Sequence, residues 1–116
     1  MEIYKDLVAL ILPEGILDYF SLLSFKKEGQ ILHVYLEEHN RIPDEYSKES
    51  YRSNGFLPEI QVKDFPVRDL FLTLHIKRRR WLLLESGKKV RRDWSILEPG
   101  TRMTKGFATF LKELAR

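Results

Sequence analysis

Two short basic segments, each close to a tryptophan, contain the residues of this sequence best suited to bind a partner. The first, Lys77–Arg80, is a run of four cations that ends at Trp81. The second, Lys88–Arg92, lies just before Trp94. Lysine and arginine contact phosphates, whereas flat rings and guanidinium planes contact bases and sugars. These residue types at this spacing therefore predict a nucleic-acid surface.

The expected surface consists of these two segments, and two later cations extend it. Its residues are Lys77, Arg78, Arg79, Arg80, Trp81, Lys88, Lys89, Arg91, Arg92, Arg102 and Lys105. A two-stranded ribbon can enter the major groove, where arginine reads guanine edges, so double-stranded DNA is the expected partner. The alternative is a solvated strand end, where charge protects a sheet edge from aggregation. Trp94 is expected in the core, whereas Trp81 is left open between core and base stacking.

The other polar residues show no pattern typical of an enzyme or a metal site. His33, His39 and His75 lack metal-binding spacing, and the chain has no cysteine for a thiolate site or a disulfide. His33 and His75 are expected to be ordinary surface or sheet-packing residues. There is no glycine-rich phosphate loop and no nucleophile pattern, and Asp93 is expected to pair with neighbouring arginines. We therefore expect no catalysis, no metal and no cofactor.

The charge of the chain is divided unevenly between its halves. Residues 1–58 hold 6 Lys and Arg against 10 Asp and Glu (net −4), and residues 59–116 hold 14 against 7 (net +7). This asymmetry indicates two faces with different partners, unless the basic half only maintains solubility. The length predicts one domain over 1–116. Because no apolar run approaches the roughly 20 residues that cross a bilayer, and the first residues do not resemble a signal peptide, no membrane contact and a cytoplasmic location are expected.

The first half of the chain is expected to supply helices and a hairpin. Apolar residues at helical spacing predict an amphipathic helix over 2–12, and Pro13 ends it and opens a second short helix. The apolar positions of these helices are Ile3, Leu7, Leu10, Ile11, Ile16, Leu17 and Phe20. Alternation predicts strands over 21–27 and 31–37, joined as a hairpin. Residues 38–56 are polar and turn-rich, which indicates a long loop with a helical turn near Asp44–Lys48.

The second half is expected to position the basic segments on a β-hairpin. Strands are predicted over 57–63 and 70–80, with a turn at 64–66 between them. The longer strand must leave the core near Arg78, because burying an unpaired charge is costly. A return strand over 89–95 completes a basic hairpin.

A final helix with an apolar stripe ends the chain. Thr101 or Thr104 can cap it. The stripe consists of Met103, Phe107, Phe110, Leu111 and Leu114. The predicted fold class is α+β, with two N-terminal helices, an antiparallel sheet of about five strands that includes the basic hairpin, and one C-terminal helix.

Six short motifs, in order along nearly the whole chain, carry a resemblance to a known family. They are Leu12–Phe20, Asp64–Arg68, Leu74–Trp81, Arg92–Trp94, Gly100–Thr104 and Phe107–Leu114. Together they resemble the N-terminal region of transposases from bacterial insertion sequences, especially a group found in Bacteroidetes. Each motif is weak alone, and their order makes the match fairly specific.

The resemblance implies a non-catalytic module that precedes or accompanies a separate catalytic domain. More distant relatives carry a zinc ribbon here, whereas this chain is cysteine-free, so packing of Trp81, Trp94 and Phe65 must replace the metal. The expected partners are double-stranded DNA at element ends for the basic half and, for the acidic half, a separately encoded catalytic transposase or a second copy of the chain in a homodimer. Two alternatives stay open, namely a protein-interaction adaptor that docks the catalytic transposase and an RNA-binding module.

Overall fold

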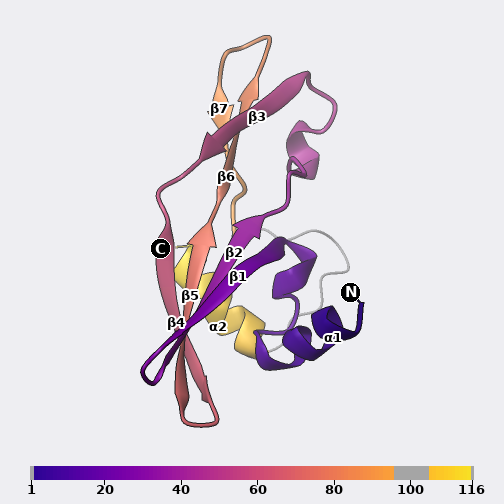
Figure 1. The fold of residues 1–116 in the computed structure, drawn as a ribbon. Coiled ribbons are helices and arrows are strands. Elements are labelled where there is room, and N and C mark those ends of the chain that lie inside the picture. Colours follow the sequence, from indigo (N-terminus) through magenta and orange to yellow (C-terminus); the bar gives the residue numbers. More distant parts are fainter. Residues whose placement is uncertain (1, 96–104, 116) are drawn as a thin grey trace.

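The structure, a computed structural model, describes residues 2–95 and 105–115 and shows a sheet-rich α+β fold (Figure 1). Its helices are α1 (Glu2–Ile11) and α2 (Lys105–Leu114), and η1 (Ile16–Asp18) and η2 (Asp44–Tyr46) are 3₁₀ turns. Its strands are β1 (Phe20–Glu28), β2 (Ile31–Glu38), β3 (Tyr51–Phe56), β4 (Ile60–Val67), β5 (Leu70–Lys77), β6 (Arg79–Leu83) and β7 (Lys89–Val90). Within the described part of the chain, no helix is long and apolar enough to cross a membrane.

The large sheet has the strand order β1-β2-β5-β4. Its inner strand β5 pairs in parallel with β2 and antiparallel with β4. The five residues from Leu72 to Ile76 are all buried, as expected for a strand with neighbours on both edges and cover on both faces. β5 is therefore the rigid element from which the basic run departs.

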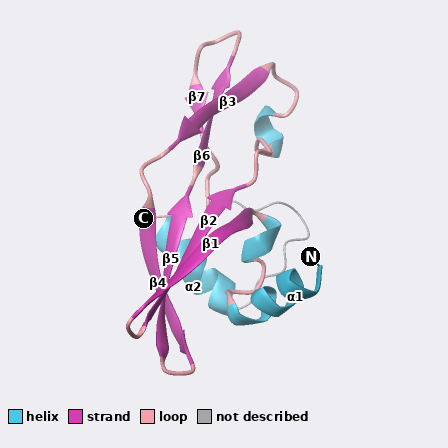
Figure 2. Cartoon of the chain, viewed as in Figure 1, coloured by secondary structure: helices cyan, strands magenta, loops and turns pink. Residues whose placement is uncertain are grey.

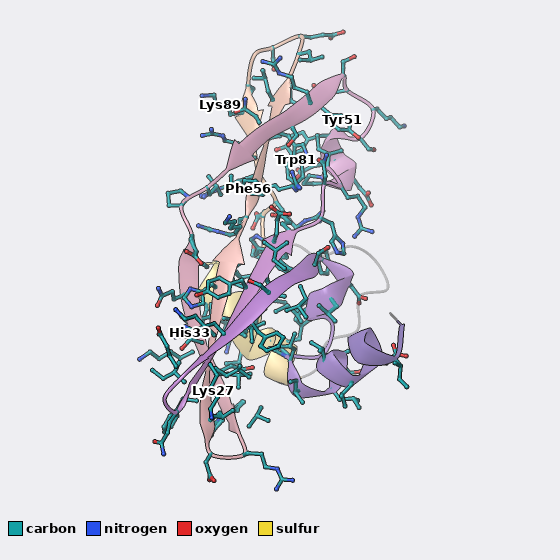
Figure 3. All side chains as sticks on the ribbon, viewed as in Figure 1. Lys27, His33, Tyr51, Phe56, Trp81 and Lys89 are labelled. Carbon is teal, nitrogen blue, oxygen red and sulfur yellow. The ribbon has the colours of Figure 1, made fainter. Side chains whose placement is uncertain are left out.

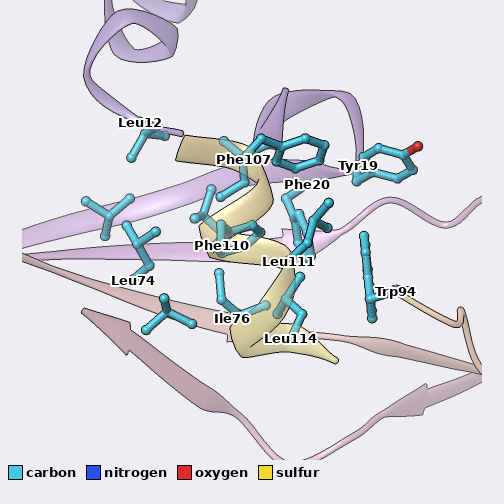
Figure 4. Close-up of a cluster of buried hydrophobic side chains, with 14 of the residues drawn as sticks. Leu12, Tyr19, Phe20, Leu74, Ile76, Trp94, Phe107, Phe110, Leu111 and Leu114 are labelled. Atoms are coloured by element: carbon cyan, nitrogen blue, oxygen red, sulfur yellow. The ribbon is translucent and has the colours of Figure 1, made fainter. Parts of the chain in front are cut away.

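The main core lies between the large sheet and α2 (Figure 4). Phe107, Phe110 and Leu114 of α2 are buried against a sheet face that includes Leu74 and Ile76. Their spacing of three and four residues places them on one side of the helix, which confirms the predicted stripe from Phe107 onward. The expected caps Thr101 and Thr104 and the stripe residue Met103 lie outside the described residues.

The small sheet, with strand order β3-β6-β7, extends beyond the end of β5 (Figures 1 and 2). The chain crosses from one sheet to the other at Arg78, which lies between β5 and β6. A second apolar cluster supports the small sheet and consists of Ile42, Trp81, Leu83 and Val90, with Tyr46 packed against it. The molecule is consequently elongated, with extents of 50 × 31 × 29 Å.

Several predictions of the second half were wrong. The chain forms seven strands in two sheets with a parallel pair, not one antiparallel sheet of about five strands. The predicted hairpin over 70–95 does not exist as such, because β7 pairs with β6 and not with β5. β4 also continues through the predicted turn at 64–66. Alternation shows that a segment is extended but does not identify its neighbour in the sheet.

Other predictions were confirmed, and two predictions of the first half were corrected in extent. The β1–β2 hairpin, the helical turn near Asp44–Lys48 and the exit from the core at Arg78 were confirmed. The second N-terminal helix is only the turn η1, and the predicted loop over 38–56 includes β3. Before η1, Gly15 has a φ of 97° and its missing Cβ would lie 3.1 Å from the Phe107 ring, so the chain approaches α2 closely there.

Candidate nucleic-acid interface

The predicted basic surface is distributed over the end of β5, the small sheet and the segment after β7. Figure 3 places Lys89, Phe56 and Trp81 on the small sheet and Lys27 at the opposite end of the molecule. The exposed cations are Lys77, Lys88, Lys89 and Arg91. Within the described residues, none of these four forms a salt bridge. Their charges are therefore available to an anionic partner.

Phe56 of β3 lies beneath two of the cations. The guanidinium carbon of Arg79 is 4.8 Å from the ring centroid, and the ammonium of Lys77 is 5.9 Å away. Cation–π attraction of this kind orients long side chains over a ring face. The ring is 37% exposed. Phe56 is thus the aromatic residue that accompanies the exposed cations.

Glu38, at the end of β2, holds two of the predicted DNA-binding arginines in structural contacts. Its carboxylate accepts hydrogen bonds from the Arg79 backbone N–H (2.9 Å) and from Nε of Arg92 (3.3 Å). Its backbone carbonyl accepts a third, from Nε of Arg79 (2.8 Å). Arg92 also donates to the carbonyl of Arg41 and is itself buried. Arg92 therefore joins the two sheets and does not face solvent.

The environment of Glu38 is unusual for a carboxylate. The residue is 2% exposed, and this burial raises the pKa of its carboxyl, although Arg79 and Arg92 act in the opposite direction. Removing a carboxylate from water is costly unless hydrogen bonds and charges replace the lost hydration. The two arginines supply those hydrogen bonds, so Glu38 is the electrostatic centre of the junction between the sheets.

Arg80 and the two tryptophans are also used internally. Nε of Arg80 donates to the carbonyl of Asn54 across β3 and β6. Trp81 is fully buried, and its indole N–H donates to Oδ1 of Asn40 at 3.0 Å. Stacking of Trp81 on a base would therefore require the small sheet to open. Trp94 packs flat against Phe20 in the main core, as predicted (ring centroids 5.2 Å apart).

Three further residues singled out from the sequence are Arg102, Lys105 and Phe65. Arg102 lies outside the described residues, and Lys105 is the first residue of α2. Phe65, expected to help to replace a zinc-centred core, is 71% exposed and does not do so. In the described part of the chain, no group of histidines and carboxylates could hold a metal ion.

A cleft of about 350 Å³ opens where the two sheets meet. It is lined by Glu38, Leu57, Arg78, Arg79, Arg91, Arg92, Asp93, Trp94, Leu114 and Ala115. Arg78 enters it from the link between β5 and β6, whereas Arg91 enters it from the segment after β7. Sequence reasoning named these arginines but missed Glu38. Continued alternation from Val34 and Leu36 was the available signal, because it places Glu38 on the same buried face.

A histidine pair lies across the large sheet, away from the basic surface. Nδ1 of His33 is 2.8 Å from Nε2 of His75. The other ring nitrogens lie 3.2 Å from Glu28 and 3.1 Å from Glu59. Tyr35 stacks on His75 with ring centroids 4.3 Å apart. Both histidines are thus sheet-packing residues, one of the two predicted roles, and they join β1, β2, β5 and Glu59, the residue before β4.

Comparison with protein-family models, with curated proteins and with solved structures gives no match. The resemblance to transposase N-terminal regions therefore stays a prediction from the six sequence motifs. The function of the basic surface must follow from its own charges and geometry.

Proposed function

We propose that this chain is a non-catalytic DNA-binding accessory module of an insertion-sequence transposase. The observation that supports DNA binding is that four cations of the predicted surface, Lys77, Lys88, Lys89 and Arg91, are exposed and form no salt bridge with another described residue. The small sheet extends from the main body, away from α1 and the β1–β2 turn (Figure 1). The transposase context is supported by the sequence resemblance alone.

Phosphate contact by these cations gives the proposal a quantitative form. Each phosphate that a protein neutralises on a duplex releases counterions and contributes about −0.9 to the slope of log K against log salt. Four cations predict a slope of about −3 to −4. Stacking of the tryptophans on bases is disfavoured as an alternative contact, because Trp81 and Trp94 are buried.

The test is fluorescence anisotropy of a labelled duplex titrated with the protein at several salt concentrations. The variant K88E/K89E reverses two exposed charges, and we expect weaker binding and a slope reduced by about 2. The control K27E/K63E reverses two exposed lysines outside the small sheet and should bind like the wild type. Failure of the wild-type protein to bind duplex at low salt would contradict the proposal.

The same titration distinguishes the competing functions. A clear preference for single-stranded RNA over duplex would favour an RNA-binding module. No affinity for either nucleic acid, together with a salt-resistant complex with a catalytic transposase, would favour the adaptor.

A further inference from the structure

The cleft between the two sheets contains more positive than negative charge. Four arginines and two carboxylates line it. Arg79 and Arg92 are both bound to Glu38, and Arg79 also lies 3.9 Å from Glu37. The charges of these two arginines are therefore compensated within the protein.

Asp93, the second carboxylate of the cleft, does not pair directly with Arg78 or Arg91. Its Oδ1 accepts hydrogen bonds from the backbone N–H (3.0 Å) and the hydroxyl (2.6 Å) of Ser95. These hydrogen bonds are the main reason why its pKa is lowered, and Arg91 contributes less. No ion pair within 4.0 Å joins Asp93 to an arginine in the described part of the chain.

Arg78 and Arg91 are left without a carboxylate partner among the described residues. Nε of Arg78 is buried and has no hydrogen-bond partner in this part of the chain. Burial is the main cause that lowers the pKa of Arg78, and the charge of Arg91 lowers it further. A buried donor without an acceptor, beside a like charge, is costly for a folded protein. An anion located between the two guanidinium groups would relieve both costs.

We propose that Arg78 and Arg91 together bind one phosphate group in this cleft. Guanidinium groups bind phosphate through paired N–H donors, which suits them to this ligand better than lysine. The cleft, of about 350 Å³, is large enough for a phosphate with part of its ester. The proposal deepens the proposed function where the phosphate belongs to DNA, and the same chemistry would accept free phosphate.

Phosphate binding would also join the two sheets. Arg78 belongs to the link between them, whereas Arg91 follows β7 of the small sheet. A ligand that contacts both and binds only the folded state raises its stability by RT ln(1 + L/Kd), where L is the ligand concentration. Phosphate should therefore act as a removable cross-link between the large sheet and the small sheet.

The first experiment measures Tm of the full chain in inorganic phosphate and in chloride of equal ionic strength. We expect phosphate to raise Tm, with an increase that grows with the logarithm of the phosphate concentration above Kd and that chloride does not reproduce. The variants R78M and R91M should lose this response, and R78M should have a Tm without phosphate at least equal to that of the wild type, since the buried Nε donor without an acceptor is removed. The control K88Q/K89Q should keep the response. A wild-type protein with equal Tm in both salts, or an R78M variant that keeps the response, would overturn the proposal.

A second experiment separates this proposal from DNA binding. If phosphate raises Tm through Arg78 and Arg91 but the duplex does not bind, these two arginines bind free phosphate and the DNA-binding function fails. If the duplex binds, R78M and R91M bind it as tightly as the wild type and phosphate does not raise Tm, the phosphate site fails and DNA binding stands. Where both hold, each variant should weaken duplex binding and reduce the salt slope by about 1.

Discussion

The carboxylate of Glu38 divides the arginines of the basic segments into two kinds. Arg79 and Arg92 donate to it and form part of the junction between the sheets. Arg78 and Arg91 lie in the same cleft without such an acceptor among the described residues. The sequence shows only adjacent cations, so this division depends on which side chain reaches the end of β2. A single acidic residue thus decides which cations remain for a ligand.

Replacing Glu38 with alanine tests its structural role. Arg92 would then lose the buried carboxylate to which its Nε donates, and removing one partner of a buried ion pair typically costs about 3–5 kcal/mol of stability. The matched control is E37A, because Glu37 is more exposed and lies 3.9 Å from Arg79, so its loss should cost at most about 1 kcal/mol. Urea unfolding of both variants measures the difference. Equal stability of E38A and E37A would contradict this role.

The pH dependence of stability gives a second test of Glu38. Burial raises the pKa of its carboxyl above the value of 4.5 in the unfolded chain, so the folded state binds this proton more tightly. Its stabilising contribution is therefore complete below 4.5 and is lost as pH rises through the folded-state pKa. Compared with E38Q, which does not titrate, the wild type should lose stability as pH rises above 4.5 and through the raised pKa of Glu38. Urea unfolding across this range checks the sign, since a group with a lowered pKa would show the opposite trend.

The elements differ in how far their local sequence determines them. The periodicity of α2 and the alternation of β2 predicted these elements correctly, because each buries one face against the main core, whereas β1 pairs with β2 and buries only Phe20. The parallel pairing of β2 with β5 could not be predicted, because the connection between them contains β3 and β4 and alternation does not specify a partner. Likewise the charge run predicted a strand exit at Arg78 but not a second sheet beyond it. The exposed lysines were predicted correctly as surface residues, whereas the burial of Trp81 and Arg92 depends on Asn40 and Glu38, which the local pattern does not identify.

Helix α1 shows that periodicity does not guarantee burial. Its predicted apolar residues Ile3, Leu7 and Leu10 are 69%, 60% and 82% exposed, whereas Val8 packs on the core and Leu12, just after the helix, is buried. The variants L7Q and L10Q should therefore change the free energy of unfolding by no more than about 0.5 kcal/mol. L12A should cost about 2–5 kcal/mol, because it creates a cavity in the main core. Chemical denaturation of the three variants measures these values, and a large loss in L7Q would mean that α1 buries this face in solution.

At the scale of the whole molecule, two apolar clusters of different size are connected by the links β2–β3, β3–β4 and β5–β6 and by the Glu38 contacts. The main core contains α2 and the large sheet, whereas the small sheet is supported by Ile42, Trp81, Leu83 and Val90. β7 contributes only Lys89 and Val90 to pairing. Apolar burial is the main source of stability, so the smaller cluster should open at a lower free energy than the larger one. The proposed ligand surface is therefore on the less stable part of the fold.

Native-state hydrogen exchange can measure this difference directly. We expect amides of β6 and β7 to exchange by a sub-global opening, and amides of β5 from Leu72 to Ile76 to exchange only on global unfolding. The variant L83A removes buried contacts from the small sheet, which is open in both the sub-global state and the unfolded state, so it should lower the opening free energies of β6 and β5 by similar amounts. Its matched control, L111A, lies in the main core, which stays folded in the sub-global opening, so it should lower the opening free energy of β5 and leave that of β6 unchanged. Phosphate should slow exchange in β6 if Arg78 and Arg91 bind it, because the ligand would have to leave before the small sheet separates. Equal protection of β5 and β6 in the wild type would show instead that the two sheets unfold as one unit.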